Sequence, residues 1–415
     1  MTTVETSLAP GSASAAEDLD GARSRANVDL MIGRLNGIAT ELEAEIEGNE
    51  RAGVLSPRTL ELLRQIQLPS MLIPESLGGM GMFPRDALAV GEKLAAIDSS
   101  VGWVGMNWSS TGLLLAFLTE ETAKDLLESG PAQPCFGASG TPTGKALPAD
   151  GGYRVSGKWA YGSGDLHADY VIVSAVLADD EGQPVMMGTT PVMLSFVVEA
   201  KDITPLGNWD VLGLRATGSV DFVVQDVFVP EDRVFSSFGA PQQEGRQVSG
   251  GIWIILTMLH TAFALGASRR LLDEVSAYAL RPSSFGKVLA DNPQFRDQYA
   301  RHEIAARSAR AWVYEVWDEV DSLMKSGAAI ERRHITLLRA AMINLHLVVR
   351  ELATFVFAKA GGTSLRAGTL QRWVRDSLAG CQHIIVSDGI YPDVAHELLG
   401  APENLVWTPL GLQAV

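Results

Sequence analysis

The type of residue that fills the chain changes twice, near residues 134 and 240, and this change limits the fold more than any other feature of the sequence. Before Pro134, apolar residues recur every three or four positions from Val28 to Leu42, which places them on one face of a helix. Between 134 and 240, glycines, prolines and β-branched residues dominate, and short runs typical of strands appear. Beyond Gly250 the helical spacing returns. The order predicts an α+β chain, mainly α-helical, with a small sheet between two helical parts.

The same changes set the expected segment boundaries. Residues 1–26 are rich in Ser, Ala, Gly and acidic residues and predict a flexible tail. We expect an N-terminal α domain over 27–133, a central β domain over 134–240 and a C-terminal α-helical bundle over 241–415. Strands are predicted at Tyr170–Val176, Met193–Val198 and Val220–Val229, and helix N-caps at Ser56 and Thr119.

Charge and composition exclude several classes of partner. The formal net charge of −16 argues against nucleic acid and anionic membranes, which would repel the chain. Gly251–Ala267 is apolar, but it is short for a membrane span and contains His260, so a buried bundle helix is the better interpretation. Cys135 and Cys381 form no disulfide framework, which favours a cytoplasmic location. The histidines have no ligand-like spacing, so no metal is expected.

Several segments together resemble the acyl-CoA dehydrogenase superfamily. They are Pro74–Gly81, Glu92–Ser100, Gly157–Gly164 and Gly213–Ser219, the last leading to Asp226–Pro230. The resemblance covers about Ala26 to Ala395. It implies a flavin held between the central β domain and the C-terminal bundle, and a homotetramer.

Within that superfamily, other segments resemble the two-component flavin-dependent monooxygenases: Gly102–Val104, Pro142–Ala146, Ser163–Ala168 and Trp373–Asp376. This resemblance implies an oxygenase that receives reduced flavin from a separate NAD(P)H-dependent flavin reductase. O2 would be the co-substrate, and a C4a-hydroperoxyflavin would oxygenate a small organic substrate. Neither a G-x-G-x-x-G after a strand nor a Walker loop is present, so an NAD(P)H site within the chain is not expected.

Gly162, Ser163 and Gly164 follow a predicted strand and offer backbone N–H groups and a hydroxyl. By themselves they predict only a turn, but the resemblance places them against the flavin ring. Trp159 or Tyr161 could form an aromatic wall, or either could belong to the core.

Arg215, Thr217 and Ser219 lie in a turn before the strand at Val220–Val229. A cation and two hydroxyls there suit a flavin phosphate or ribityl chain, or equally a salt-bridged, hydroxyl-capped turn.

Arg281 and Phe285 resemble the element by which a neighbouring subunit holds the flavin nucleotide, and Gly361 and Gly362 resemble its partner element. The Arg-to-Phe spacing is one residue longer than in the usual dehydrogenase motif, and Ala358 stands where dehydrogenases often have Gln. Both differences weaken the expected binding of the adenosine half of FAD, so the cofactor can be either FMN or FAD.

The catalytic prediction depends on a count from Asp376. Many acyl-CoA dehydrogenases place a glutamate base eight residues after an Arg-Asp pair, and here that position is Ile384, which accepts no proton. His383, one residue earlier, resembles the histidine of the monooxygenases. A neutral imidazole there can take a proton from a substrate or donate one to a flavin peroxide. Ser163 is the second predicted catalytic residue, acting near flavin N5.

Trp103, Asn107, Thr111 and His167 are the predicted substrate-binding residues, although His167 fits an orienting hydrogen bond within its loop equally well. Monooxygenases that hydroxylate phenols often carry a second histidine in the helix after Gly102–Val104, and residues 105–111 contain none. This argues against a phenol. An amine, a heteroatom or an enolised polyketide fits as well.

Two other functions remain open. An acyl-CoA or acyl-carrier dehydrogenase or oxidase with bound FAD would need Glu397 or Asp388 as its base. A flavin-fold protein without catalysis would act only as a binding partner.

Overall fold

The computed structural model describes residues 11–188, 190–237, 239–243, 246–282, 286–408 and 411–414. Its N-terminal part is helical, as predicted. The long helix α1 begins at Gly11, within the segment 1–26 that the sequence predicts as a tail. The helices of this part are α1 (Gly11–Ala52), α2 (Pro57–Gln65), α3 (Pro84–Ile97), α4 (Ser99–Gly112) and α5 (Glu120–Glu128).

Local sequence signals explain where these helices start and which face they bury. The Ser56 hydroxyl accepts from the Thr59 amide at 3.1 Å and caps α2, whose first residue is Pro57. Thr119 caps α5 in the same way. The apolar series of α1 is buried at Met31 and Leu42, as its spacing predicts.

The central part is a seven-stranded sheet in the order β7-β8-β2-β1-β3-β6-β9, with β1 and β3 parallel and the other neighbours antiparallel. It lies within the predicted range of 134–240 and contains the three predicted strands, together with strands that were not predicted. The strands are β1 (Phe136–Ala149), β2 (Gly152–Trp159), β3 (Tyr170–Leu177), β6 (Met193–Glu199), β7 (Ile203–Pro205), β8 (Phe222–Pro230) and β9 (Val234–Phe235), with a separate hairpin of β4 (Met186–Met187) and β5 (Thr190–Pro191).

The C-terminal part is a helical bundle, in which α7 begins at Pro293 and Gly327 and Gly361 follow the ends of α7 and α8. A terminal hairpin of β10 (Leu405–Thr408) and β11 (Gly411–Ala414), which the sequence did not indicate, ends the described chain. The helices are α6 (Gly251–Ala279), α7 (Pro293–Ser326), α8 (Arg332–Ala360), α9 (Thr369–Gly380) and α10 (Tyr391–Leu398).

Two segments are long and apolar enough to cross a membrane by length and composition, α6 and Arg332–Leu365. In α6, 78% of the apolar window is buried within the protein, and in the second segment 61%. A core helix of a soluble bundle passes the same test, and the burial of α6 agrees with the prediction of a buried bundle helix.

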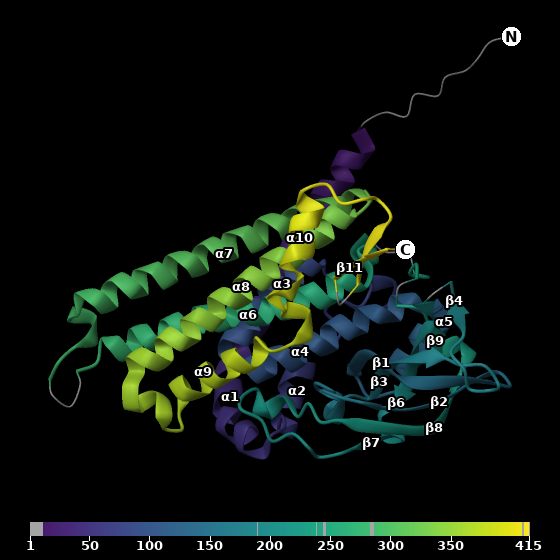
Figure 1. Cartoon of the computed structure of the whole chain (residues 1–415), viewed down its shortest axis with the longest axis horizontal. Coiled ribbons are helices and arrows are strands. Elements are labelled where there is room, and N and C mark those ends of the chain that lie inside the picture. Colours follow the sequence, from purple (N-terminus) through teal and green to yellow (C-terminus); the bar gives the residue numbers. More distant parts are fainter. Residues whose placement is uncertain are drawn as a thin grey trace, which may run out of the picture.

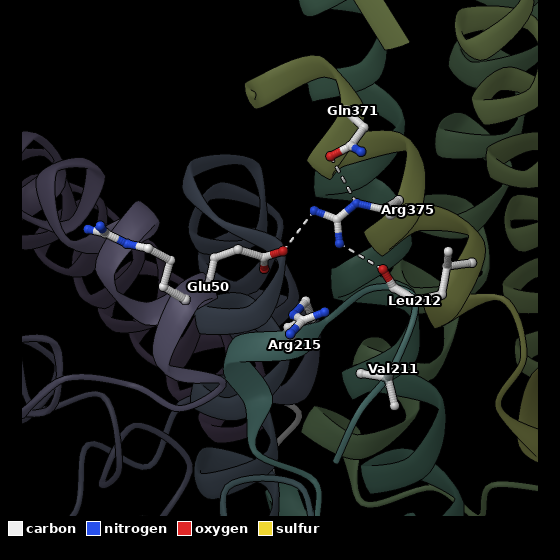
Figure 2. A pocket seen from close by; sticks show the side chains of 7 residues that line it. Glu50, Val211, Leu212, Arg215, Gln371 and Arg375 are labelled. Carbon is white, nitrogen blue, oxygen red and sulfur yellow. Dashed lines mark hydrogen bonds and ion pairs between the residues drawn. The ribbon is translucent and has the colours of Figure 1, made fainter. Parts of the chain in front are cut away.

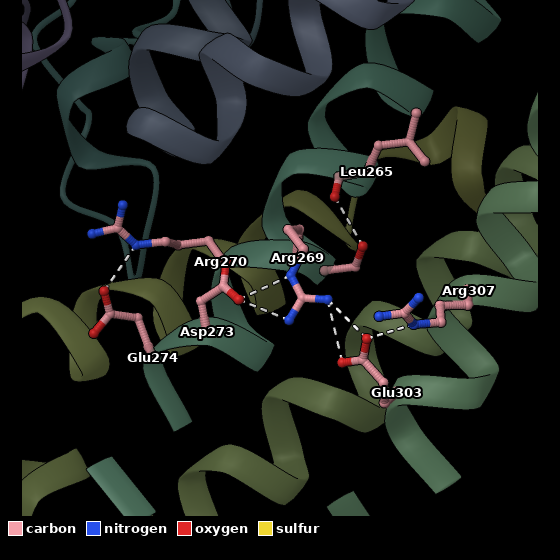
Figure 3. A network of polar contacts seen from close by, with 8 residues as sticks. Leu265, Arg269, Arg270, Asp273, Glu274, Glu303 and Arg307 are labelled. Atoms are coloured by element: carbon pink, nitrogen blue, oxygen red, sulfur yellow. Dashed lines mark hydrogen bonds and ion pairs between the residues drawn. The ribbon is translucent and has the colours of Figure 1, made fainter. Parts of the chain in front are cut away.

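Charged side chains also pair within and between helices of the bundle. Arg269 of α6 pairs with Asp273 at 2.8 Å on its own helix and with Glu303 of α7 at 3.0 Å (Figure 3). These groups are largely solvated, so each pair contributes little to stability.

The bundle and the sheet lie on opposite sides of α4 (Figure 1). Helix α4 is buried along its whole length and contacts β1 on one side and α6 and α9 on the other. It also contacts the short 3₁₀ helix η5 (Arg215–Thr217). The helix that carries Trp103 and Asn107 therefore joins the two halves of the molecule.

Candidate active site

The turn after β2 is held in place by side chains from α4. Gly164 has a φ of +80°, and a Cβ there would lie 2.8 Å from the Trp108 ring nitrogen, so only glycine fits. Trp108 donates to the Gly164 carbonyl at 3.2 Å, and Asn107 donates to the Ser163 carbonyl. The turn is therefore a fixed part of the interface between the sheet and α4.

Three hydroxyls form a continuous chain behind this turn. Ser163 Oγ lies 2.8 Å from Ser219 Oγ, which lies 2.7 Å from Thr217 Oγ1. Thr217 donates onward to the Leu214 carbonyl at 2.7 Å, and the Trp103 indole N–H donates to Ser163 at 3.1 Å. Thr217 and Ser219 are buried. The structure thus brings together three predicted cofactor residues and one predicted substrate residue.

A buried carboxyl group extends this network to α9. Asp376 accepts from the Leu214 amide at 2.7 Å and from the Ser99 hydroxyl at 2.6 Å. Leu214 has a φ of +54°, an unfavourable backbone for a leucine, which this hydrogen bond helps to hold. Burial raises the pKa of Asp376 to about 7, although the Ser99 hydrogen bond lowers it.

Arg215 faces away from the two hydroxyls that follow it. It lines a surface cavity of about 540 Å³, where Figure 2 shows it with Glu50 and Arg375. Arg375 is paired with Glu50 at 2.7 Å and donates to the Leu212 carbonyl at 2.7 Å. Arg215 approaches only the exposed Asp210, at 3.9 Å. The structure therefore does not bring the Arg215 guanidinium to the hydroxyls of Thr217 and Ser219, because the 3₁₀ turn points it outward.

The two candidate aromatic walls have opposite environments. Trp159 is 0% exposed; it stacks on Phe222 and donates to the Ser174 carbonyl at 2.9 Å, so it belongs to the core of the sheet. Tyr161 is 69% exposed and meets Trp209 edge to face, with ring centroids 6.3 Å apart. Only Tyr161 is free to contact a ligand.

His383 lies on the other side of Trp103 from Ser163. The centroids of its ring and the Trp103 ring are 6.0 Å apart. His383 caps the 3₁₀ helix η10 (Ile384–Val386), where its Nδ1 accepts from the Ile385 amide at 3.3 Å. Burial lowers the pKa of His383 to about 4, so the ring is neutral at pH 7. The neutral ring then carries its proton on Nε2.

Two further histidines, which sequence reasoning did not select, lie beside His383. His260 of α6 has its ring centroid 4.2 Å from that of His383 and 5.0 Å from that of Trp103, and His346 of α8 lies 6.4 Å beyond His260. Burial lowers the pKa of His346 to about 4 and that of His260 well below its usual value. Within the described ranges no group of His, Cys, Asp or Glu is arranged to hold a metal ion. The cluster is thus a set of neutral imidazoles.

Two of the predicted substrate residues of α4 are occupied by contacts within the protein. The Asn107 amide holds the Ser163 carbonyl, and the Thr111 hydroxyl makes a long contact of 3.5 Å with Asn107. Both side chains are buried. In this structure they support the turn.

The loop after the turn carries two further ionisable residues, the buried Asp165 and the partly exposed His167. Burial lowers the pKa of His167 to about 4 and raises that of Asp165 to about 8. Among the residues that the structure describes, His167 Nε2 and both Asp165 oxygens lack a hydrogen-bond partner. His167 is thus not tied by its Nε2 into an orienting hydrogen bond.

The predicted nucleotide clamp lies elsewhere. Arg281 follows the end of α6, and Gly361 and Gly362 follow the end of α8, at the end of the bundle far from the sheet (Figure 1). Phe285 lies outside the described residues. One chain therefore does not bring these residues to the Ser163 turn.

The residues that the dehydrogenase alternative requires are poorly placed for proton abstraction. Glu397 is paired with Arg332 at 2.6 Å, and Asp388 lies 3.6 Å from Arg350 at the surface. Ile384 is 61% exposed. Among the described side chains, none of these three makes a side-chain hydrogen bond, ion pair or ring contact with Trp103 or His383, whereas the His260 ring contacts both.

The sequence of the chain is similar to one known protein family and to several named proteins. Residues 258–388 match the family described as acyl-CoA dehydrogenase, C-terminal domain. A pigment production hydroxylase of Rhodococcus erythropolis is 29% identical over 373 residues, which cover 86% of this chain and 92% of that protein. The flavin-dependent monooxygenase, oxygenase subunit HsaA, of Rhodococcus jostii (strain RHA1) is 27% identical over 369 residues, covering 84% and 93%.

The fold has a close match among solved structures. XiaF from Streptomyces sp., in complex with FADH2 and glycerol, matches with a TM-score of 0.82 at 24% identity, covering 93% of this chain and 98% of that one. At this level of identity the likeness shows the fold, which is the predicted arrangement of a helical domain, a small sheet domain and a helical bundle. Residues 258–388 thus match the C-terminal domain of acyl-CoA dehydrogenases, and the chain is similar along most of its length to proteins named as hydroxylases and flavin-dependent monooxygenases.

Proposed function

We propose that the chain is the oxygenase component of a two-component flavin-dependent monooxygenase. It takes reduced flavin, FMN or FAD, from a separate NAD(P)H-dependent reductase and uses O2 to oxygenate a small organic substrate. The observation that carries the proposal is the position of Trp103, which donates to Ser163 on one side and contacts His383 and His260 on the other. The same ring joins the flavin turn to neutral imidazoles.

The residues at the turn fit a flavin. Ser163 is partly exposed, its hydroxyl is oriented by Trp103 and Ser219, and the exposed Tyr161 ring is two residues away. A bound reduced flavin supplies the two electrons that activate O2. The chain itself contributes a fixed hydroxyl donor and an apolar surrounding that keeps water away from the reacting atoms.

His383 acts through the atom that its helix cap leaves free. Since Nδ1 accepts from Ile385, the neutral ring offers an N–H at Nε2. That N–H donates a hydrogen bond to an oxygen atom of the substrate or of activated O2, and it orients that atom for reaction. Low pKa values keep the imidazoles uncharged at pH 7, so they do not repel each other.

We also propose that the cytoplasmic protein is a homotetramer, and that the Arg281 and Gly361–Gly362 elements of one subunit serve the flavin site of another. Their distance from the Ser163 turn within one chain supports this assignment. XiaF, whose structure contains FADH2, shares the fold.

The test uses the protein with reduced and with oxidised flavin, both as FMN and as FAD. We expect tight binding of the reduced form, weaker binding of the oxidised form and, in air, a slower return of oxidised-flavin absorbance than for free reduced flavin. Equal binding of both redox states together with unchanged reoxidation would contradict the proposal. Tight oxidised FAD that a thioester bleaches would instead select the dehydrogenase.

A further inference from the structure

The surface cavity beside Arg215 is lined by more cations than its acid can neutralise. It lies where the end of α1, the loop before η5 and α9 meet, and its volume is about 540 Å³ (Figure 2). Three arginines line it, Arg51, Arg215 and Arg375, and among the described residues Glu50 is the one lining carboxylate. The whole chain carries a net charge of −16. The cavity is therefore a positively charged site on a negatively charged protein.

One of these arginines is fully used within the protein. Arg375 pairs with Glu50 at 2.7 Å and donates to the Leu212 carbonyl at 2.7 Å. Its third nitrogen donates to the Gln371 side chain at 3.2 Å, and Figure 2 shows all three contacts. Because Glu50 is occupied by Arg375, it does not neutralise the other two arginines. The uncompensated charge of the cavity is that of Arg215 and of Arg51 at its rim.

The Arg215 guanidinium has no close partner. Its nearest carboxylate is that of Asp210, 3.9 Å away, and the Asp210 side chain is fully exposed. An ion pair of this length between solvated groups contributes little. Among the described residues, no side-chain hydrogen bond is made by this guanidinium, although it carries five N–H donors. These donors are available to a ligand in the cavity.

The loop that carries Arg215 is fixed by its contacts with α9. A Cβ at Gly213 would lie 2.3 Å from the Arg375 carbonyl oxygen, so the loop backbone packs directly on the helix. The next residue, Leu214, has the unfavourable φ of +54° and donates its amide to Asp376 at 2.7 Å. Strained backbone persists where the surroundings impose it, and it is common at ligand sites. Arg215 is therefore held at the cavity by the fold, without a partner there.

We propose that this cavity binds a phosphate monoester, an organic molecule that carries a phosphate dianion. The Arg215 guanidinium donates to the phosphate oxygens in the forked geometry that suits them, and Arg51 adds positive charge at the rim. The volume of about 540 Å³ exceeds what a free phosphate ion needs and lies within the roughly 300–1,000 Å³ of small-molecule sites. Leu212, which is 62% exposed, offers apolar surface to the organic part.

The site is distinct from the turn to which the flavin is assigned. Neither Ser163 nor Tyr161 lines the cavity, and Arg215 points away from the buried hydroxyls of Thr217 and Ser219. The proposal therefore goes beyond the proposed function and does not depend on it.

The test is isothermal titration calorimetry of the whole chain without flavin. The probe is phenyl phosphate at pH 8, where it is a dianion because the second pKa of a phosphate ester is about 6. Phenyl sulfate has the same shape with one charge, and inorganic phosphate lacks the apolar part. We expect phenyl phosphate to bind most tightly of the three. Saturating reduced FAD, which contains no phosphate monoester, should leave this affinity unchanged.

Three variants connect the binding to the named side chains. In Arg215→Gln we expect the affinity for phenyl phosphate to fall about 10- to 100-fold, because hydrogen bonds between charged groups are lost. Arg296→Gln is the matched control: it removes the same charge from an exposed position on α7, and it should bind like the natural protein. Glu50→Gln removes the acid that holds Arg375, and the affinity should rise about threefold.

The inference is overturned by an unchanged affinity in Arg215→Gln, by an equal loss in Arg296→Gln, or by phenyl sulfate binding as tightly as phenyl phosphate. Displacement of phenyl phosphate by reduced FAD would assign the cavity to the flavin and would also overturn it. If thermal unfolding shows that Arg215→Gln is not folded, Glu50→Gln decides: tighter binding supports the site, and unchanged or weaker binding refutes it. The proposed function fails separately, when reduced flavin is not preferred or its reoxidation is not slowed.

Discussion

The two sides of Trp103 differ in how their polar groups are satisfied. On the sheet side, Ser163, Ser219 and Thr217 are linked by hydrogen bonds of 2.7–2.8 Å. On the bundle side, His260 Nδ1 and His346 Nε2 have no partner among the described atoms. These three hydroxyls satisfy one another, and side chains of α4 hold the turn that carries Ser163. The bundle side leaves hydrogen-bonding capacity unused, as a binding site for a polar ligand does.

The largest loss of activity is expected on the bundle side of Trp103, where histidine nitrogens lack hydrogen-bond partners. Replacing His383 by Ala removes the Nε2 donor and the η10 cap, and we expect product formation to fall roughly 10²- to 10⁴-fold, the range for a positioned acid–base group. Product is measured by chromatography with supplied reduced flavin. His334→Ala, which removes a histidine cap in the first turn of α8, is the control. Loss of product with reoxidation still slowed separates oxygen transfer from flavin binding, and undiminished product would refute the role.

The second prediction concerns pH and the buried carboxyl of Asp376. Its pKa is about 7 in the folded chain, above the ordinary value of 3.8, so the native state binds its proton more tightly than the unfolded state does. Its contribution to stability is complete below pH 4 and is lost as pH rises to 7, by on the order of 4 kcal/mol. Urea unfolding across this range measures the slope.

Asp376→Asn tests this assignment, because an amide can still accept from Leu214 and meet Ser99 while it carries no charge. We expect the variant to lose less stability than the natural protein between pH 4 and 7. Asp165→Asn is the comparison, since the pKa of Asp165 is raised to about 8 and its effect should extend to higher pH. Parallel curves for Asp376→Asn and the natural protein would show that folding does not raise the pKa of Asp376.

The third prediction concerns a steric clash at Gly164, in the turn on the sheet side of Trp103. In Gly164→Ala the new Cβ meets Trp108 and Val104 at 2.8 and 2.9 Å and the backbone keeps a positive φ, so we expect a loss of about 3 kcal/mol in the free energy of unfolding. Gly151 has a similar φ of +73° with open space around it. Gly151→Ala should cost only about 1 kcal/mol. Equal losses in thermal or urea unfolding would show that α4 does not constrain the turn.

The smallest effect is expected from removing one link of the hydroxyl chain. Ser219→Ala deprives Ser163 and Thr217 of their shared partner, and it should cost about 1 kcal/mol with a modest weakening of reduced-flavin binding. Ser174→Ala is the control, because its hydroxyl makes only a 3.5 Å contact in the sheet. If both variants bind reduced flavin equally, the chain does not orient Ser163 toward the cofactor.

Part of the site could be predicted from the sequence because it depends on neighbours along the chain. The Gly162–Gly164 turn follows its strand as expected, and the count from Asp376 directs attention to His383, whose ring lies near that of Trp103. The outward direction of Arg215 could not be predicted, because it depends on the φ of Leu214, which Asp376 of α9 helps to hold. The burial of Trp159 likewise depends on Phe222 of a strand that is distant in sequence.

The sequence by itself determined the order of helical and β segments, most of their boundaries and the residues of the turn, since periodicity, caps and glycines act over a few positions. Only the tertiary structure decided which polar groups meet across the chain. His260 is one apolar-helix histidine in the sequence, and it becomes a neighbour of His383 only when α6 packs against α4 and α9. Periodicity shows that a side chain faces the core, but not what it meets there, because the partner is set by the packing of whole helices.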